Sequence, residues 1–162
     1  MAIDKVRKYL KRWGRDINIL EFDTSSATVE MASNALGVEP CRIAKTLSFK
    51  TEDGAMLIVA AGDAKVDNSK FKGEFGMKAK MLTPEEVLEY TGHAVGGVCP
   101  FGLIQELPVY CDFSMKRFDT VFPACGSSNS AIELTCDELE EYSNNTKWVD
   151  VCKGWQEIEI EM

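Results

Sequence analysis

Hydrophobic and polar positions follow helical spacing in some segments of the chain and strand spacing in others. Apolar residues three to four positions apart predict helices, and alternation or short apolar runs predict strands. The predicted helices cover residues 3–13, 27–36, 67–76, 83–90 and 136–143. The predicted strands cover residues 17–22, 42–50, 55–62, 107–113, 120–125, 131–134 and 147–151.

Capping and turn residues support these boundaries. Thr83 with Glu86, and Thr135 with Glu138, have the spacing of a capping box at a helix start. Asp53 is followed by Gly54, which is typical of a hairpin apex. Strands and helices are mixed and hairpins outnumber helical crossovers. The sequence therefore predicts a single α+β domain over residues 1–162, with a mixed, curved sheet and flanking helices.

Composition restricts the class of protein. The 162 residues carry a net charge of −8, which argues against a broad nucleic-acid surface. No apolar run is long enough to cross a bilayer and the N-terminus lacks a signal-peptide core, so we expect no membrane association and a cytoplasmic location. The six cysteines are then expected to be reduced. The chain has one histidine and no C-x-x-C spacing, so we expect no bound metal. It contains no nucleotide-binding motif, so we expect no cofactor.

One segment departs from the acidic average. Residues 65–80 hold five lysines and two acidic residues. A solvated face is the common outcome for such a run. The functional alternative is a surface for a phosphate backbone. In that case the contacts come from Lys70, Lys72, Lys78 and Lys80.

The stretch "TGHAVGGVCPFG", residues 91–102, concentrates glycines with a proline, a cysteine and the only histidine. Glycines permit close approach of the backbone to a ligand, but they also serve ordinary turns. His93 and Cys99 are a candidate nucleophilic pair. The alternative is that Cys99 is a small buried hydrophobe and His93 bonds to backbone.

Lys45 lies on a strand face that is otherwise apolar. In "RIAKTLSF" alternation places Ile43, Lys45, Leu47 and Phe49 on the same side of the strand. The ammonium group could reach water along its apolar stem. Alternatively, it is held at the edge of a pocket, where it grips a phosphate or a carboxylate. The pattern does not separate these two roles.

Five motifs occur together in a characteristic order. They are "IAKTL", "VAAGD", "TGHAVGGVCPFGL", "VYCDFSM" and a Gly/Ser loop before "IEL". In this order the chain, from about residue 20 to 152, resembles the YbaK family, the prolyl-tRNA-synthetase-associated editing domain. The resemblance implies a barrel-like mixed sheet and a free-standing deacylase of mischarged tRNA. Its partners would be the tRNA 3′ acceptor end and, for some members, prolyl-tRNA synthetase.

The resemblance also implies roles for particular residues. Lys45 matches a lysine that positions the ester or a phosphate of the terminal adenosine. Gly96 and Gly97 would supply backbone N–H groups for the oxyanion, in a loop that cradles the aminoacyl ester. The remaining residues expected at the substrate are Thr46, His93, Val98, Cys99, Pro100, Asp112, Gly126 and Ser127.

Some positions depart from the cysteine-specific branch of the family. That branch has a serine and two glycines where this chain has Ala124, Cys125 and Gly126, and an acidic residue where this chain has Ala131. Deacylation of alanine, cysteine, serine or threonine on tRNA for proline is the function expected. The alternative is a tRNA- or partner-binding module that keeps the fold without turnover. The sequence leaves the oligomeric state open.

Overall fold

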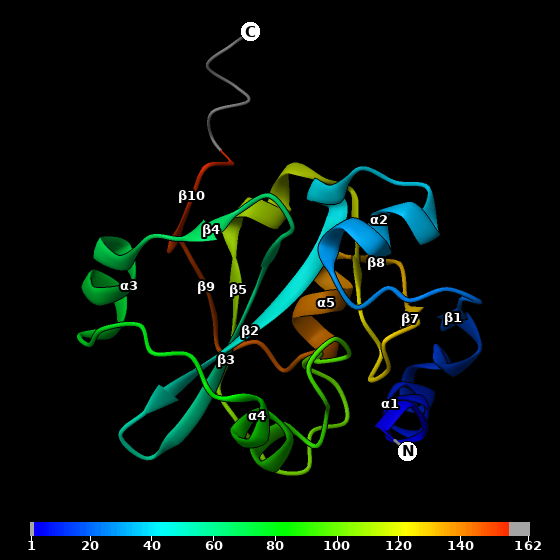
Figure 1. Cartoon of the computed structure of the whole chain (residues 1–162), viewed down its shortest axis with the longest axis horizontal. Coiled ribbons are helices and arrows are strands. Elements are labelled where there is room, and N and C mark those ends of the chain that lie inside the picture. The colour runs from blue at the N-terminus through cyan, green and yellow to red at the C-terminus, as the bar shows by residue number, and fades with distance from the viewer. Residues whose placement is uncertain (1, 156–162) are drawn as a thin grey trace, which may run out of the picture.

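The computed structural model describes residues 2–155, so the ends of the predicted domain, residue 1 and residues 156–162, lie outside the described residues. A six-stranded sheet, ordered β8-β6-β2-β3-β5-β9, forms its centre. The sheet is mixed: β2 pairs antiparallel with β3 and parallel with β6, whereas β3, β5 and β9 run parallel. It curls into a half-barrel with helices around it, which confirms the predicted α+β class (Figure 1).

The elements agree with most of the predicted ranges. The α-helices are α1 Ala2–Leu10, α2 Val29–Leu36, α3 Asn68–Phe75, α4 Pro84–Thr91 and α5 Cys136–Tyr142. The strands of the central sheet are β2 Ile43–Thr51, β3 Gly54–Ala61, β5 Val109–Asp112, β6 Thr120–Pro123, β8 Leu134–Thr135 and β9 Lys147–Val149. Two small ribbons pair β1 Leu20–Glu21 with β7 Ser130–Ala131, and β4 Lys65–Val66 with β10 Cys152–Lys153.

Local chemistry explains where the helices begin and end. Thr83 and Thr135 form the predicted capping boxes with Glu86 and Glu138. Asp67 caps α3 by accepting from the Lys70 N–H at 3.0 Å. Glycines in the left-handed conformation, as at Gly37 with φ 71°, end α2, α3 and α4.

Two strand predictions were only partly correct. Of the strand predicted over 17–22, only β1 Leu20–Glu21 is present, and residues Asp16–Asn18 form a 3₁₀ helix, in a turn closed by the Asn18 N–H on the Arg15 carbonyl. Ile17 is 83% exposed, so the apparent alternation does not mark a buried face. The strand predicted over 131–134 is split between β7 and β8, which belong to different sheets, because the chain changes its pairing partner there.

The core lies between the sheet and its covering segments. β3 is buried along almost its whole length, as its continuous apolar run predicts for a central strand. Val6 and Leu10 of α1 and Leu139 of α5 are fully buried in the same cluster. No helix within residues 2–155 is long and apolar enough to cross a membrane.

Candidate functional site

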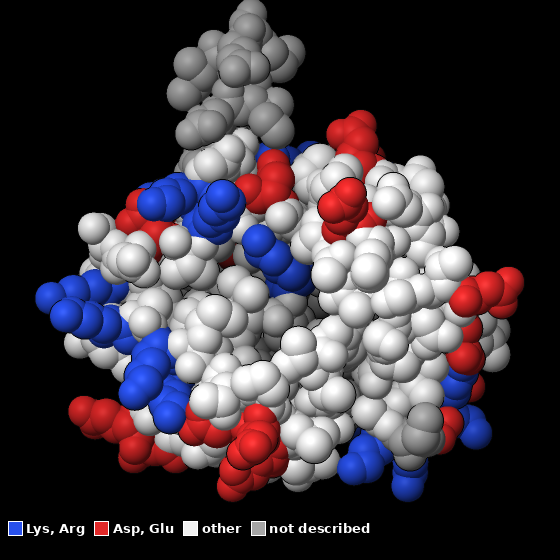
Figure 2. All heavy atoms as spheres, viewed as in Figure 1, with Lys and Arg blue, Asp and Glu red and all other residues white. Residues whose placement is uncertain are grey.

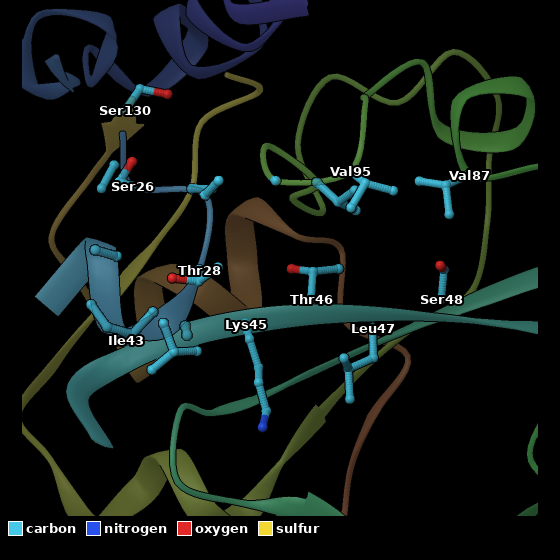
Figure 3. A pocket seen from close by; sticks show the side chains of 18 of the residues that line it. Ser26, Thr28, Ile43, Lys45, Thr46, Leu47, Ser48, Val87, Val95 and Ser130 are labelled. Atoms are coloured by element: carbon cyan, nitrogen blue, oxygen red, sulfur yellow. The ribbon is translucent and has the colours of Figure 1, made fainter. Parts of the chain in front are cut away.

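A cavity of about 400 Å³ opens beside β2, between the start of α2 and the loop that follows α4. Figure 2 shows a hollow near the centre of the face turned to the viewer, and Figure 3 shows the side chains that line the cavity. Most of the lining is apolar. Its hydroxyl groups come from Ser26, Thr28, Thr46, Ser48 and Ser130. Among the described residues of the lining, Lys45 is the only charged one, and none carries a carboxylate, imidazole or thiol.

Two glycine-containing loops meet at one side of this cavity. The Gly126 N–H donates to the Gly97 carbonyl at 3.0 Å. A Cβ atom on Gly97 would lie 2.7 Å from the Ser127 nitrogen, so this contact requires glycine. The Ser127 hydroxyl donates to Asn129 Oδ1 and accepts from the Ser130 hydroxyl within its own loop. Gly97 and Gly126 thus hold the two loops together, and neither they nor Ser127 are part of the lining.

The first of these loops contributes residues to the lining of the cavity. Gly96, with φ 99°, and Val98 line the cavity. The Gly97 N–H is already occupied, since it donates to the Ala94 carbonyl at 3.0 Å. Within residues 2–155 the structure shows no hydrogen bond from the Gly96 or Val98 N–H. The N–H groups of Gly96 and Val98, rather than those of Gly96 and Gly97, can therefore donate to a ligand.

Lys45 and Thr46 are adjacent on β2 and point to opposite sides of the strand (Figure 3). Lys45 is half-buried, and its ammonium group donates to the Gly62 carbonyl at 3.4 Å. Burial lowers the pKa of Lys45; Cys152 and Asp63 oppose this shift and Lys65 adds to it. The ammonium is therefore held at the edge of the cavity with one long hydrogen bond to a neutral partner.

Thr46 presents a buried hydroxyl that has no hydrogen-bond partner among the described residues. Thr46 points toward the loop that carries Val95, on the same side as Ser48 (Figure 3). A buried hydroxyl without a partner is costly, by about 1–3 kcal/mol. A ligand in the cavity would relieve this cost by accepting from or donating to Thr46.

His93 and Cys99 are both fully buried and lie outside the lining. The imidazole Nε2 is 2.7 Å from the Phe101 carbonyl, which can only accept, so Nε2 carries the proton. Cys99 Sγ lies 3.6 Å from this protonated nitrogen, which cannot take the thiol proton. Burial raises the pKa of Cys99 to about 12, so the group is a thiol at neutral pH. The geometry favours the structural alternative for this pair.

Burial of His93 predicts a loss of stability at acidic pH. Burial, together with the charge of Lys5, lowers the pKa of His93 below its ordinary 6.5, although the hydrogen bond to Phe101 opposes the shift. The unfolded chain therefore binds a proton at His93 more readily than the folded chain does. The contribution of the neutral imidazole to stability is complete above pH 6.5 and is lost as the pH falls below this value. Urea unfolding of the wild type and of His93→Gln, from about pH 7.5 to 5.5, should show their stability difference shrinking. A difference independent of pH would contradict this.

Two further predicted residues are placed away from the cavity. The two carboxylate oxygens of Asp112 accept from the Ser114 and Val151 N–H groups, each at 2.9 Å. Asp112 thereby ties the end of β5 to the segment after β9. Pro100 lines a separate depression, which also contains Tyr9 and Trp13. Of the predicted site residues, the structure brings Lys45, Thr46, Gly96 and Val98 together at the cavity.

The basic segment of residues 65–80 lies over β4, α3 and the turn after it. Figure 2 shows Lys and Arg side chains gathered over the part of this face that α3 and β4 occupy, to one side of the hollow. Lys70 is engaged in an ion pair with Asp150 at 3.1 Å. Lys72, Lys78 and Lys80 are exposed.

Sequence reasoning missed the segment before α2, which closes the cavity beside the two glycine-containing loops. Ser26 is buried, and its hydroxyl donates to the Ser128 carbonyl at 3.3 Å. Thr28 caps α2 by accepting from the Met31 N–H. The run "TSSAT" before a helix signals a cap, but nothing local places it against residue 128. Ala124 and Ala131, the positions that depart from the cysteine-specific branch, also line the cavity.

Comparison with known proteins shows which class of protein this chain belongs to. A solved structure described as a candidate trans-editing enzyme for prolyl tRNA synthetase superposes with a TM-score of 0.85 at 31% identity, covering 94% of this chain and 98% of that one. The uncharacterized protein YwhH of Bacillus subtilis is 59% identical over 157 residues, 96% of this chain and all of that protein. The proline–tRNA ligase of Bacillus licheniformis is 31% identical over 128 residues, 78% of this chain and 22% of the ligase.

The family model of the aminoacyl-tRNA editing domain matches residues 23–142. The chain belongs to this family. The fold agrees with that membership, and the resemblance inferred from sequence is confirmed.

Proposed function

We propose that this protein is a trans-editing deacylase that hydrolyses a small amino acid wrongly esterified to tRNA for proline. The candidate amino acids are alanine, cysteine, serine and threonine. The observation that carries the proposal is that Lys45, Thr46, Gly96 and Val98 line one cavity of about 400 Å³. That volume lies in the range of small-molecule sites and suits a small aminoacyl group.

The proposed chemistry uses polarity and position rather than a nucleophile. An aminoacyl ester is already reactive, so stabilising the oxyanion is the main requirement. The N–H groups of Gly96 and Val98 are the donors that we assign to this task. Lys45 would hold an anionic oxygen of the terminal nucleotide. Because the described lining has no carboxylate or imidazole, the water would be activated by the substrate's own amine or hydroxyl.

A panel of mischarged tRNAs tests the proposal. tRNA for proline carrying alanine, cysteine, serine, threonine or proline would be incubated with the protein, and ester loss compared with buffer. At least one of the four small mischarged esters should be cleaved well above the rate for the proline ester. If a folded preparation cleaves none of them above buffer, the enzyme proposal is wrong.

A binding module without turnover is the second candidate. It is favoured by the lack of a general base in the lining and by the direction of Lys45, which points away from Thr46. Such a module would bind charged tRNA and slow the spontaneous loss of the ester. The panel separates the two functions, since one shortens the lifetime of the ester and the other lengthens it.

Replacing Thr46 by valine should separate stability from activity. The free protein loses a buried hydroxyl without a partner, so its unfolding free energy should be unchanged or higher by about 1 kcal/mol. If Thr46 bonds the substrate, the single-turnover rate should fall about tenfold. Thr46→Ser, which keeps the hydroxyl, should retain most of the rate. A fully active Thr46→Val would exclude this interaction.

A further inference from the structure

Two lysines occupy directly opposed positions on the small ribbon formed by β4 and β10. Lys65 pairs with Lys153 in the antiparallel register, next to the pair of Val66 with Cys152. Opposed residues have Cβ atoms about 4.5–5.5 Å apart, and like charges at such positions are destabilising. Both lysines are exposed. The fold therefore places two positively charged side chains next to each other, at a cost to its own stability.

The carboxylates around this ribbon are engaged elsewhere. Asp63 binds Arg117 through both oxygens, at 2.6 and 3.0 Å. Asp150 pairs with Lys70, and Asp67 caps the start of α3. Among residues 2–155 neither Lys65 nor Lys153 forms an ion pair, although Lys153 contributes to the lowering of the Asp67 pKa, which is due mainly to the hydrogen bond from the Lys70 N–H.

The ribbon is close to the cavity through a short connection. Lys65 follows Gly62 by three residues, and the Gly62 carbonyl accepts the hydrogen bond from Lys45. Lys65 is also near enough to add to the lowering of the Lys45 pKa, which burial dominates. An extended anion on the ribbon would thus continue toward the ammonium at the edge of the cavity. Figure 2 shows Lys and Arg side chains gathered beside the hollow in the region of α3 and β4.

We propose that Lys65 and Lys153 form a phosphate-binding site for the single-stranded 3′ end of an RNA whose terminal residue occupies the cavity. This inference rests on the proposed function and deepens it, since it names where the sugar–phosphate backbone enters. A phosphate between the two ammonium groups replaces their repulsion by two charge-assisted hydrogen bonds.

The test compares Lys65→Gln/Lys153→Gln with Lys8→Gln/Lys11→Gln. The control removes the same charge from exposed lysines of α1 and the 3₁₀ turn after it, far from β4 in Figure 1. The probe is an RNA hairpin that copies an acceptor stem and ends in CCA. It carries no attached amino acid, so binding is measured without hydrolysis. Fluorescence anisotropy over a range of salt gives Kd and its salt dependence.

The ribbon variant should bind about tenfold more weakly at low salt, and its salt slope should fall by about 0.7 for each phosphate that it no longer neutralises. The control should bind within about twofold of the wild type. Thermal unfolding should occur at the wild-type temperature or above it in the ribbon variant, because the repulsion is removed. Equal binding by both variants would overturn the inference.

Hydrolysis, measured separately, distinguishes this inference from the proposed function. At saturating mischarged tRNA the ribbon variant should cleave at the wild-type rate. If the wild type cleaves the ester but the ribbon variant binds RNA unchanged, only the phosphate site is wrong. If the wild type cleaves nothing and RNA binding still depends on the two lysines, the site stands and the deacylase proposal fails. An RNA hairpin that does not bind the wild type overturns the site.

Discussion

Replacing Lys45 by methionine is expected to lower kcat/KM for a mischarged tRNA by about 100-fold, equivalent to ~3 kcal/mol of transition-state stabilisation. Methionine retains an apolar stem of similar length, so packing on β2 is preserved. The reduced rate follows from removal of the charge, which is half-buried and, among residues 2–155, hydrogen-bonded only to the Gly62 carbonyl at 3.4 Å. A buried charge with so weak a partner interacts strongly with an anionic group that comes within reach.

Lys50→Met provides the matched control for this variant. Lys50 lies on the same strand, but near the hairpin, where it pairs with Glu86 at 2.8 Å. Its replacement should change the deacylation rate less than about twofold, since Lys50 does not line the cavity and its charge is already paired with Glu86. Single-turnover kinetics on both variants decide the outcome. If folded Lys45→Met cleaves at the wild-type rate, Lys45 has no part in the reaction.

Gly97→Ala is expected to reduce both stability and activity. The added Cβ would lie 2.7 Å from the Ser127 nitrogen and 2.9 Å from the Gly126 carbonyl carbon, and backbone atoms cannot move aside cheaply. Overpacking of this kind costs about 1–3 kcal/mol of unfolding free energy. Relief of the clash moves the loop that carries Gly96 and Val98, and a displacement near 1 Å can lower the rate about 100-fold.

Gly73→Ala is the control for an added methyl group. Gly73 lies in α3, no atom lies within 4 Å of its added Cβ, and alanine favours the helix by about 0.5–1 kcal/mol. This variant should be as active as the wild type and at least as stable. Urea unfolding and single-turnover deacylation, measured on both variants, check the pair of expectations. A Gly97→Ala protein that matches the wild type in both assays would mean that the two loops are not rigidly held.

Much of the fold could be predicted because its signals are local. The capping boxes that begin at Thr83 and Thr135 depend on residues three positions apart, and the structure has both. The Asp53-Gly54 hairpin and the buried run of β3 are equally local. The 17–22 segment could not be assigned correctly, because its alternation is not matched by burial: Ile19 is buried and Ile17 is exposed.

The candidate site was predicted less completely. Strand alternation placed Lys45 and Thr46 on opposite sides of β2. The family resemblance selected Gly96 and Gly97 for the oxyanion and His93, Val98, Cys99 and Pro100 for the substrate, and of these only Gly96 and Val98 line the cavity. Local pattern could not show that the Gly97 N–H donates to the Ala94 carbonyl. It also could not show that both carboxylate oxygens of Asp112 accept hydrogen bonds from backbone N–H groups. Hydrogen-bond partners distant in sequence decide which polar groups remain available to a ligand.

The sequence by itself determined most of the elements and their limits, since caps, turns and side-chain periodicity act over a few residues. Tertiary structure alone decided which of these elements meet. It brought the loop at Gly97 against Gly126, closed the cavity with Ser26, and set Lys65 opposite Lys153. These pairings join residues from 29 to 102 positions apart. They form only when the curled sheet and the core beneath it fix the relative positions of the segments, because the entropy cost of closing such loops is met by burial across the whole domain.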